Sequence, residues 1–355
     1  MFRTVTLAFL LVSFSLFSGV AYALMTSNTL ESPNKDFKIV VYIGPINDVG
    51  FGVFYKGELL TRVSGMSFET ADDDQLPATA SYTLRHLRDK TEADAPVPTP
   101  SRFKANSIGT TEAKAFRDAE NNVDYNEMMV VYQKRKEGRG ELPAGATRLD
   151  PDDYEDVIKI VFRAYDAGIA YCYEIATKEG EPITIKNENV EFVFPDDYSC
   201  TVQEQQRLGI FGFGRTVTVG RTTSLSKIAK GHKNPLYFEV HKGAWKMEMR
   251  LTGAHLLYEF AQLQFQPGRE RTGTFDNLYD RHGNVDKTGK LTGIALLLDS
   301  NTEIPGTGLP FRTPWRSMQR SSDGDAMEGM YQSLQKPDPP GGREPLFTIP
   351  RARGE

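Results

Sequence analysis

Cysteine is nearly absent from the chain, which has only Cys172 and Cys200 among its 355 residues. So few thiols exclude a disulfide-dense scaffold, and two cysteines alone cannot complete a four-ligand zinc site. The two residues form a candidate disulfide if they lie on neighbouring strands in an oxidising compartment. The alternative is a pair of unpaired buried thiols, and the sequence leaves both open.

Motifs that carry catalysis are missing as well. The five histidines show neither H-E-x-x-H nor an i, i+4 pairing, and no G-x-S-x-G nucleophile elbow occurs. Two glycine-rich stretches, 209–214 and 283–290, fail the spacing of nucleotide-binding loops, and Asp72-Asp73-Asp74 lacks the spaced oxygen ligands of a calcium loop. The sequence therefore predicts no catalytic residue, no metal ligand and no cofactor.

An excess of positive charge is also lacking, since 42 Lys and Arg against 47 Asp and Glu give a net charge of −5 and a pI near 5.7. No stripe of lysine and arginine interleaved with aromatic residues occurs, so a phosphate backbone is a poor partner for this chain. We expect no nucleic-acid partner.

Long apolar runs are confined to the amino terminus. Met1-Phe2-Arg3 precedes the run from Val5 to Val20, and Ala21-Tyr22-Ala23 follows it as a small-x-small cleavage site. The run is short for a membrane span, so the pattern favours a signal peptide over residues 1–23 rather than a retained anchor. We expect a secreted, extracellular protein that begins at Leu24 and has no membrane segment after cleavage.

What the chain does contain is a dense pattern of strands. Val161–Tyr165 and Ile169–Glu174 alternate with a period of two on either side of Asp166-Ala167-Gly168, which predicts a half-buried hairpin with Gly168 at positive φ. With 39% hydrophobic residues, 31 Gly and 20 Pro, the composition suits one large all-β unit. Further strands are expected at 37–43, 50–55, 59–60, 63–68, 128–132, 190–194, 216–219, 235–240, 245–251 and 291–298. Residues 151–156 are expected as a charged connection.

Four stretches resemble, in order and spacing, the amino-terminal domain of glycoside hydrolase family 97, the α-glucosidase and α-galactosidase family. The resemblance covers residues 32–340. It rests on Phe162–Tyr171 with Tyr173 and Glu174, Glu191–Tyr198, Tyr125–Met128, and Thr313–Met318.

The resemblance implies a large antiparallel β-super-sandwich, similar to the galactose-mutarotase fold and with few short helices, over residues 24–336. Residues 337–355 remain as a Pro/Gly/Arg-rich tail. In the family this domain packs against a (β/α)₈ barrel that carries the catalytic carboxylates, and no stretch of this chain matches that barrel. Inverting members carry His-Glu-Ala on the strand matching 243–252, and its glutamate reaches a calcium ion. Met249 and Arg250 stand at the His-Glu positions here, which argues against that calcium site.

Two functions compete on this reading. The first is a secreted, non-catalytic sandwich that binds carbohydrate or scaffolds a partner chain. The second is a truncated or split glycoside hydrolase that needs a separate catalytic barrel. Trp245 and Trp315 are the candidate sugar-stacking residues, against the alternative that they pack in the core or between domains. Glu174, Glu191 and Glu248 are strand acids for which we expect no catalytic role; a sugar epimerase ranks third, because no acid and base are placed by motif.

Overall fold

The computed structural model describes the chain in segments. These are residues 26–43, 49–72, 75–77, 105, 107–136, 151–195, 198–208, 215–224, 232–233, 237–242, 245–252, 263–267, 271–274, 288–298, 302–320, 324–335 and 345–349. Residues 1–25, which include the expected signal peptide and its cleavage position, lie outside them. In the part that is described, no helix has the length and apolar character needed to cross a bilayer.

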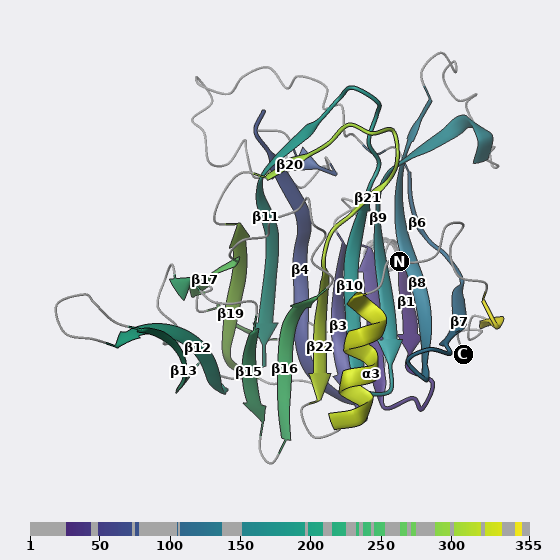
Figure 1. Cartoon of the computed structure of the whole chain (residues 1–355). Helices are drawn as coiled ribbons and strands as arrows, with labels where there is room; N and C mark the ends of the chain where they lie inside the picture. Colours follow the sequence, from purple (N-terminus) through teal and green to yellow (C-terminus); the bar gives the residue numbers. More distant parts are fainter. Residues whose placement is uncertain are drawn as a thin grey trace, which may run out of the picture.

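Most described residues belong to two large antiparallel sheets (Figure 1). The first sheet has 11 strands, eight of them in the order β1-β2-β3-β4-β11-β19-β17-β14. Its strands are β1 (Thr26–Glu31), β2 (Phe37–Ile43), β3 (Val49–Tyr55), β4 (Glu58–Thr70), β5 (Gln75–Leu76), β11 (Ile183–Phe194), β14 (His232–Lys233), β17 (Leu263–Pro267), β18 (Arg271–Thr274), β19 (Thr288–Leu298) and β20 (Thr302–Ile304).

The second sheet has 12 strands, ten of them in the order β13-β12-β15-β16-β22-β10-β9-β8-β7-β23. Its strands are β6 (Ser107–Thr110), β7 (Ala113–Asp118), β8 (Val123–Arg135), β9 (Tyr154–Tyr165), β10 (Gly168–Ile175), β12 (Ser199–Leu208), β13 (Arg215–Ser224), β15 (Tyr237–Lys242), β16 (Trp245–Thr252), β21 (Phe311–Arg312), β22 (Trp315–Arg320) and β23 (Phe347–Ile349). The described helices are the 3₁₀ turn η2 (Pro151–Asp153) and α3 (Gly324–Gln335).

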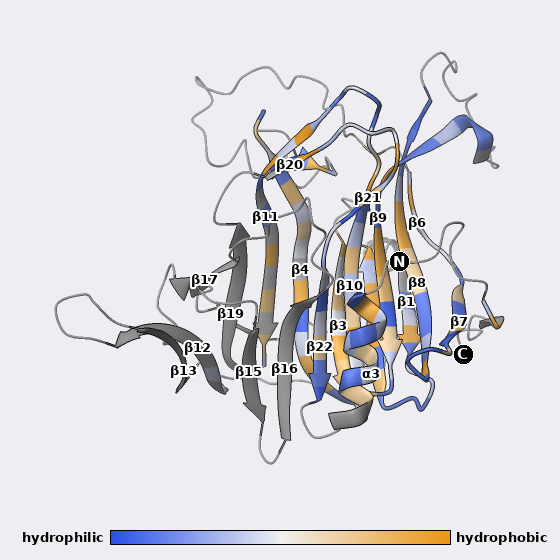
Figure 2. Ribbon diagram, in the orientation of Figure 1, coloured by the Kyte–Doolittle hydropathy of each residue, from blue (hydrophilic) through white to orange (hydrophobic). Residues whose placement is uncertain are grey.

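The main core lies between the two sheets and contains contacts between aromatic residues of one sheet and those of the other. Phe51 of β3 lies 5.1 Å from Phe162 of β9 and 5.3 Å from Tyr171 of β10, measured between ring centroids. Phe68 of β4 lies 4.7 Å from Tyr173 of β10. Figure 2 shows hydrophilic and hydrophobic residues interspersed along β4, so that one face of this strand enters the core. The predicted all-β sandwich is confirmed.

The central hairpin is buried on both faces, so the prediction of a half-buried sheet was wrong. Phe162 and Tyr171 point into the main core, whereas Val161, Tyr165 and Cys172 belong to a second apolar cluster on the outer face of the 12-stranded sheet. Met330 and Leu334 of α3 complete that second cluster (Figure 1). The helix therefore covers this face of the sheet, and it is not among the elements predicted from the sequence.

The turn of the central hairpin also differs from the expected geometry. Tyr165 pairs directly with Gly168, so Asp166 and Ala167 form the turn, and Gly168 is not among the glycines with positive φ. A Cβ at Gly168 would lie 2.2 Å from the carbonyl oxygen of Met318 in β22. Glycine is thus required here by the close approach of a neighbouring strand rather than by backbone conformation.

Two further segments depart from the expectations. Residues 154–156, expected in a charged connection, begin the long strand β9, with only Pro151–Asp153 forming a turn before it. Residues 347–349, within the expected tail, form β23 on the edge of the 12-stranded sheet. Strands β2, β3 and β11 cover the predicted ranges, and β4 joins the two runs expected at 59–60 and 63–68.

Candidate functional site

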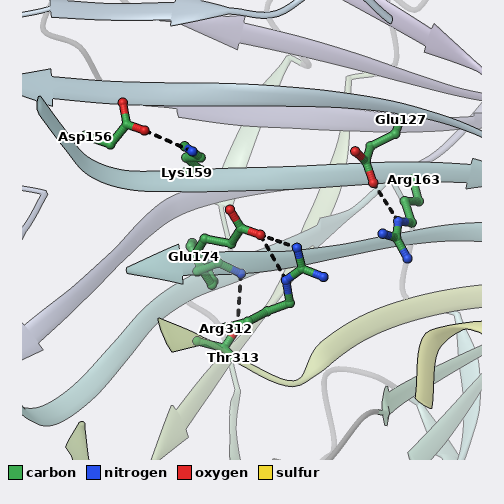
Figure 3. A network of polar contacts seen from close by, with 8 residues as sticks. Glu127, Asp156, Lys159, Arg163, Glu174, Arg312 and Thr313 are labelled. Carbon is green, nitrogen blue, oxygen red and sulfur yellow. Dashed lines mark hydrogen bonds and ion pairs between the residues drawn. The ribbon is translucent and has the colours of Figure 1, made fainter. Parts of the chain in front are cut away.

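A buried arginine lies at the centre of the outer face of the 12-stranded sheet. Arg163 of β9 is 2% exposed, and its Nε donates a hydrogen bond of 2.7 Å to Oε2 of Glu127 in β8 (Figure 3). Its guanidinium carbon lies 4.7 Å from the ring centre of Tyr125 and 4.5 Å from that of Trp315. The cation is thus neutralised by one carboxylate and contacts two aromatic rings, which is how a protein tolerates a charge away from water.

A second ion pair lies nearby, where β21 joins β10. Nε of Arg312 donates a 3.0 Å hydrogen bond to Oε1 of Glu174, and a terminal nitrogen of the same guanidinium contacts that oxygen too (Figure 3). The Arg312 guanidinium also lies 5.9 Å from the ring centre of Trp315. The Tyr173 N–H donates to the Thr313 hydroxyl at 3.0 Å, which fixes the start of the Thr313–Met318 segment against β10.

We call these five residues the outer-face strip: Glu127, Arg163, Trp315, Arg312 and Glu174. The strip contains two carboxylates and two guanidinium groups, each acid paired with one cation. Both carboxylates therefore have their ion-pair partner within the sheet. The arrangement stiffens the sheet and positions the Thr313–Met318 segment.

A third ion pair lies inside the sandwich and joins the two sheets. Arg316 of β22 contacts Oε2 of Glu188 in β11, and it also donates to the Thr313 hydroxyl at 2.8 Å and to the carbonyl oxygen of Pro314. The two side chains are 3% and 0% exposed. Burial raises the pKa of Glu188, while the Arg316 guanidinium opposes that rise. Both members of the pair are therefore removed from solvent in the part of the chain that the structure describes.

The two candidate sugar-binding tryptophans have different outcomes. Trp315 is 3% exposed, and its ring contacts the guanidinium groups of Arg163 and Arg312 within the protein. This burial favours the packing alternative over sugar stacking. Trp245 is the first residue of β16, and its side chain lies outside the described ones.

The candidate disulfide between Cys172 and Cys200 does not fit the sheet order. Cys172 is a free, buried thiol on β10, and Cys200 lies on β12. Strands β15, β16 and β22 separate β12 from β10. At about 4.8 Å a strand this separation is roughly 19 Å, whereas a disulfide needs Cα atoms within about 7 Å. Of the two alternatives that the sequence leaves open, the sheet order favours unpaired cysteines.

The Cys172 thiol is expected to be inert in the folded protein. Burial raises its pKa to about 12, and the nearby guanidinium groups of Arg312 and Arg163 lower it only in part. Since the thiolate is the nucleophile, iodoacetamide at pH 8 should leave Cys172 unmodified in the native protein and alkylate it in urea, as read by peptide mass mapping. Alkylation at equal rates in both states would contradict this burial.

Metal ligands do not gather among the described residues, where no group of three His, Cys, Asp or Glu side chains is placed to hold an ion. The side chains of Glu191, Glu248, Met249 and Arg250 lie outside this set. The predictions about those four positions therefore remain predictions.

Sequence reasoning missed the three ion pairs, two of them buried and the Arg312–Glu174 pair partly exposed. Arg163 was interpreted only as one position in an alternating strand, although an arginine between apolar and aromatic neighbours indicates that a buried partner is needed. Its partner Glu127 lies 36 residues away, and Glu188 lies 128 residues from Arg316. No local pattern joins residues so far apart.

Comparison with known proteins gives one family. The model of the glycosyl-hydrolase 97 N-terminal domain matches residues 30–336. No curated protein sequence matches the chain.

Solved structures give weak similarity over most of the chain. A glycoside hydrolase family 97 enzyme from Pseudoalteromonas sp. strain K8 matches in its panose and acarbose complexes, each with a TM-score of 0.49 and 16% identity. Each match covers 88% of this chain and 38% of the enzyme. A β-arabinopyranosidase matches with a TM-score of 0.45 and 12% identity, over 82% of this chain and 40% of the other. The chain thus spans about two fifths of the length of these enzymes.

Proposed function

We propose that this chain, which belongs to the glycosyl-hydrolase 97 N-terminal family, is a secreted, non-catalytic sandwich. Its role would be that of a scaffold for enzymes that process glycosides. The observation that carries the proposal is the outer-face strip, in which Glu127 and Glu174 each neutralise an arginine. Glycoside hydrolysis requires two carboxyl groups flanking the anomeric carbon, one of which keeps its proton near neutral pH. Secretion rests on the pattern of residues 1–23.

The contacts that the described charged residues make support a scaffolding role. The ion pair of Glu127 with Arg163 links β8 to β9. That of Glu174 with Arg312 links β10 to β21. The pair of Glu188 with Arg316 links one sheet to the other. Each pair makes its contact within the sandwich. A rigid sandwich of this kind suits the presentation of a surface to a partner chain.

The purified chain is expected to hydrolyse neither aryl α-glucosides nor aryl α-galactosides. Calcium should not restore activity, since Arg250 stands where the resembled inverting enzymes carry a calcium-binding glutamate and a cation repels the metal. The measurement is release of the aryl chromophore over hours, with and without added calcium.

Glutamine variants of three acids make the assay decisive. Glu174→Gln, Glu191→Gln and Glu248→Gln keep the side-chain shape and remove the titrating group. Turnover by the unmodified chain that one of these substitutions abolishes would refute the non-catalytic proposal. Turnover unaffected by all three comes either from another carboxyl group of the chain, which would also refute the proposal, or from a contaminating hydrolase, which a mock purification without this chain reveals.

Carbohydrate binding is the part of the proposal that depends on Trp245, because Trp315 is covered. A titration of tryptophan fluorescence with maltose- and galactose-type sugars separates the two roles, with Trp245→Phe as the matched control. A saturable change that disappears in Trp245→Phe supports sugar binding at β16. No change at millimolar sugar leaves scaffolding alone.

The second candidate function is one half of a split glycoside hydrolase. It is favoured by the extent of the family match, which is to an amino-terminal domain and ends at residue 336. Reading the coding sequence that neighbours this one tests it. A neighbouring reading frame for a (β/α)₈ barrel would support the split enzyme, and its absence would count against it.

A further inference from the structure

Three polar atoms lie in the main core without a hydrogen-bond partner in the part of the chain that the structure describes. They are the hydroxyl oxygens of Tyr171 and Tyr173 on β10 and the Oε1 atom of Glu188 on β11. All three side chains have an exposed fraction of 0%. A buried polar group without a partner is costly, because it has given up its hydrogen bonds to water, so these atoms require an explanation.

The three atoms belong to one place between the sheets. Tyr171 pairs directly with Arg316 of β22, and Glu188 pairs directly with Phe68 of β4. The two tyrosine rings lie 5.9 Å apart between centroids, and the Tyr173 ring lies 4.7 Å from that of Phe68. The guanidinium carbon of Arg316 lies 5.5 Å from the centre of the Tyr173 ring, and the same guanidinium contacts Oε2 of Glu188. Both hydroxyls and Oε1 are therefore grouped around a single ion pair.

The protonation states determine which of these atoms donate and which accept. Burial raises the pKa of both tyrosine hydroxyls, and the nearby Glu188 carboxylate raises it further, so both keep their protons. Glu188 is paired with Arg316, whose guanidinium does not lose its proton, and its Oε1 can accept hydrogen bonds. The group therefore holds two unused donors and one unused acceptor.

The charges at this place select the kind of ligand that fits it. The Arg316 guanidinium would repel a cation, and the Glu188 carboxylate would repel an anion, most strongly where water is excluded. The ligand is therefore neutral, and it must accept two hydrogen bonds and donate at least one. Water does this with a single oxygen atom, and internal waters typically make about three hydrogen bonds to buried polar groups that lack other partners.

We propose that this group of side chains is a binding site for one internal water molecule between β10 and β11. The water accepts a hydrogen bond from the hydroxyl of Tyr171 and another from that of Tyr173, and it donates one to Oε1 of Glu188. Because the tyrosines belong to the 12-stranded sheet and Glu188 to the 11-stranded sheet, the water links the two sheets beside the ion pair. The competing arrangement is a direct hydrogen bond from a tyrosine hydroxyl to Oε1, without water.

A crystal structure of the unmodified chain, at a resolution that shows ordered water, separates the two arrangements. We expect one density peak within about 3 Å of both hydroxyl oxygens and of Oε1 of Glu188. A hydroxyl bonded directly to Oε1, or the lack of such a peak, would overturn the proposal. This experiment needs no variant, so it remains decisive if the variants below fail to fold.

Oxygen-17 magnetic relaxation dispersion counts the long-lived internal waters in solution. The double variant Tyr171→Phe with Tyr173→Phe should lose one of them, because Glu188 alone cannot supply the two or more polar partners that a buried water needs. Tyr42→Phe is the matched control, since the hydroxyl of this buried tyrosine donates to the Val63 carbonyl oxygen at 3.3 Å, and it should leave the count unchanged. Equal counts in the double variant and the unmodified chain, or the same loss in Tyr42→Phe, would overturn the proposal.

Discussion

Replacing Glu188 by leucine is expected to lower the free energy of unfolding by about 3–5 kcal/mol. The substitution leaves the Arg316 guanidinium buried at 3% exposure without its carboxylate. Arginine does not lose its proton in proteins, so the uncompensated charge persists in the folded state. Urea unfolding followed by circular dichroism gives the change in free energy.

The double variant Glu188→Leu with Arg316→Met is the matched control. Removing both charges replaces the ion pair by apolar side chains of similar volume, which is often neutral or stabilising for a buried pair. We therefore expect the double variant to recover most of the loss. If it stays as unstable as Glu188→Leu, the loss comes from packing between β11 and β22 rather than from the orphaned charge.

Arg316→Met alone should be milder and should depend on pH. Without the guanidinium, burial raises the pKa of Glu188 further above its ordinary value of 4.5. A carboxyl whose folded pKa is raised contributes its full stability below the unfolded pKa and loses it as pH rises through the folded pKa. Relative to the unmodified chain, this variant should therefore weaken as pH rises from about 4.5. An unchanged difference between pH 4 and 7 would contradict it.

Part of the fold was predictable from the sequence. Period-two alternation predicted β2, β3, β11 and the central hairpin, because each strand presents an apolar face to the core. The alternation could not reveal that the opposite face of β9 is also covered, since Met330 and Leu334 lie far along the chain in α3. Burial on the second face is a property of tertiary packing.

The candidate site was harder to predict than the fold. The family resemblance identified the Thr313–Met318 segment, but it left Trp315 open between sugar stacking and packing and gave Arg316 no role. In the structure Trp315 contacts two guanidinium groups and Arg316 contacts Glu188. The residue types alone did not decide between a ligand and an internal partner, because aromatic faces and arginines serve both.

Gly168→Ala is expected to destabilise the protein by about 3 kcal/mol, at the upper end of the overpacking range. The added Cβ would lie 2.2 Å from the Met318 carbonyl oxygen and 2.8 Å from the Gln319 Cα. Both atoms belong to the backbone of β22, so no side-chain rotation relieves the clash. The strand itself must move away from β10.

That displacement acts on the whole 12-stranded sheet. β22 is the strand that joins β16, β15, β12 and β13 to β10 and its neighbours, and Gly168 pairs directly with Gln319. Gly109→Ala in β6 is the matched control: a Cβ there meets nothing within 4 Å, and Gly109 is not among the glycines with positive φ. Alanine at Gly109 should stabilise the protein by about 0.4–1 kcal/mol by restricting the unfolded chain. Equal effects of the two substitutions in urea unfolding would mean that β10 and β22 do not approach as closely as the structure places them.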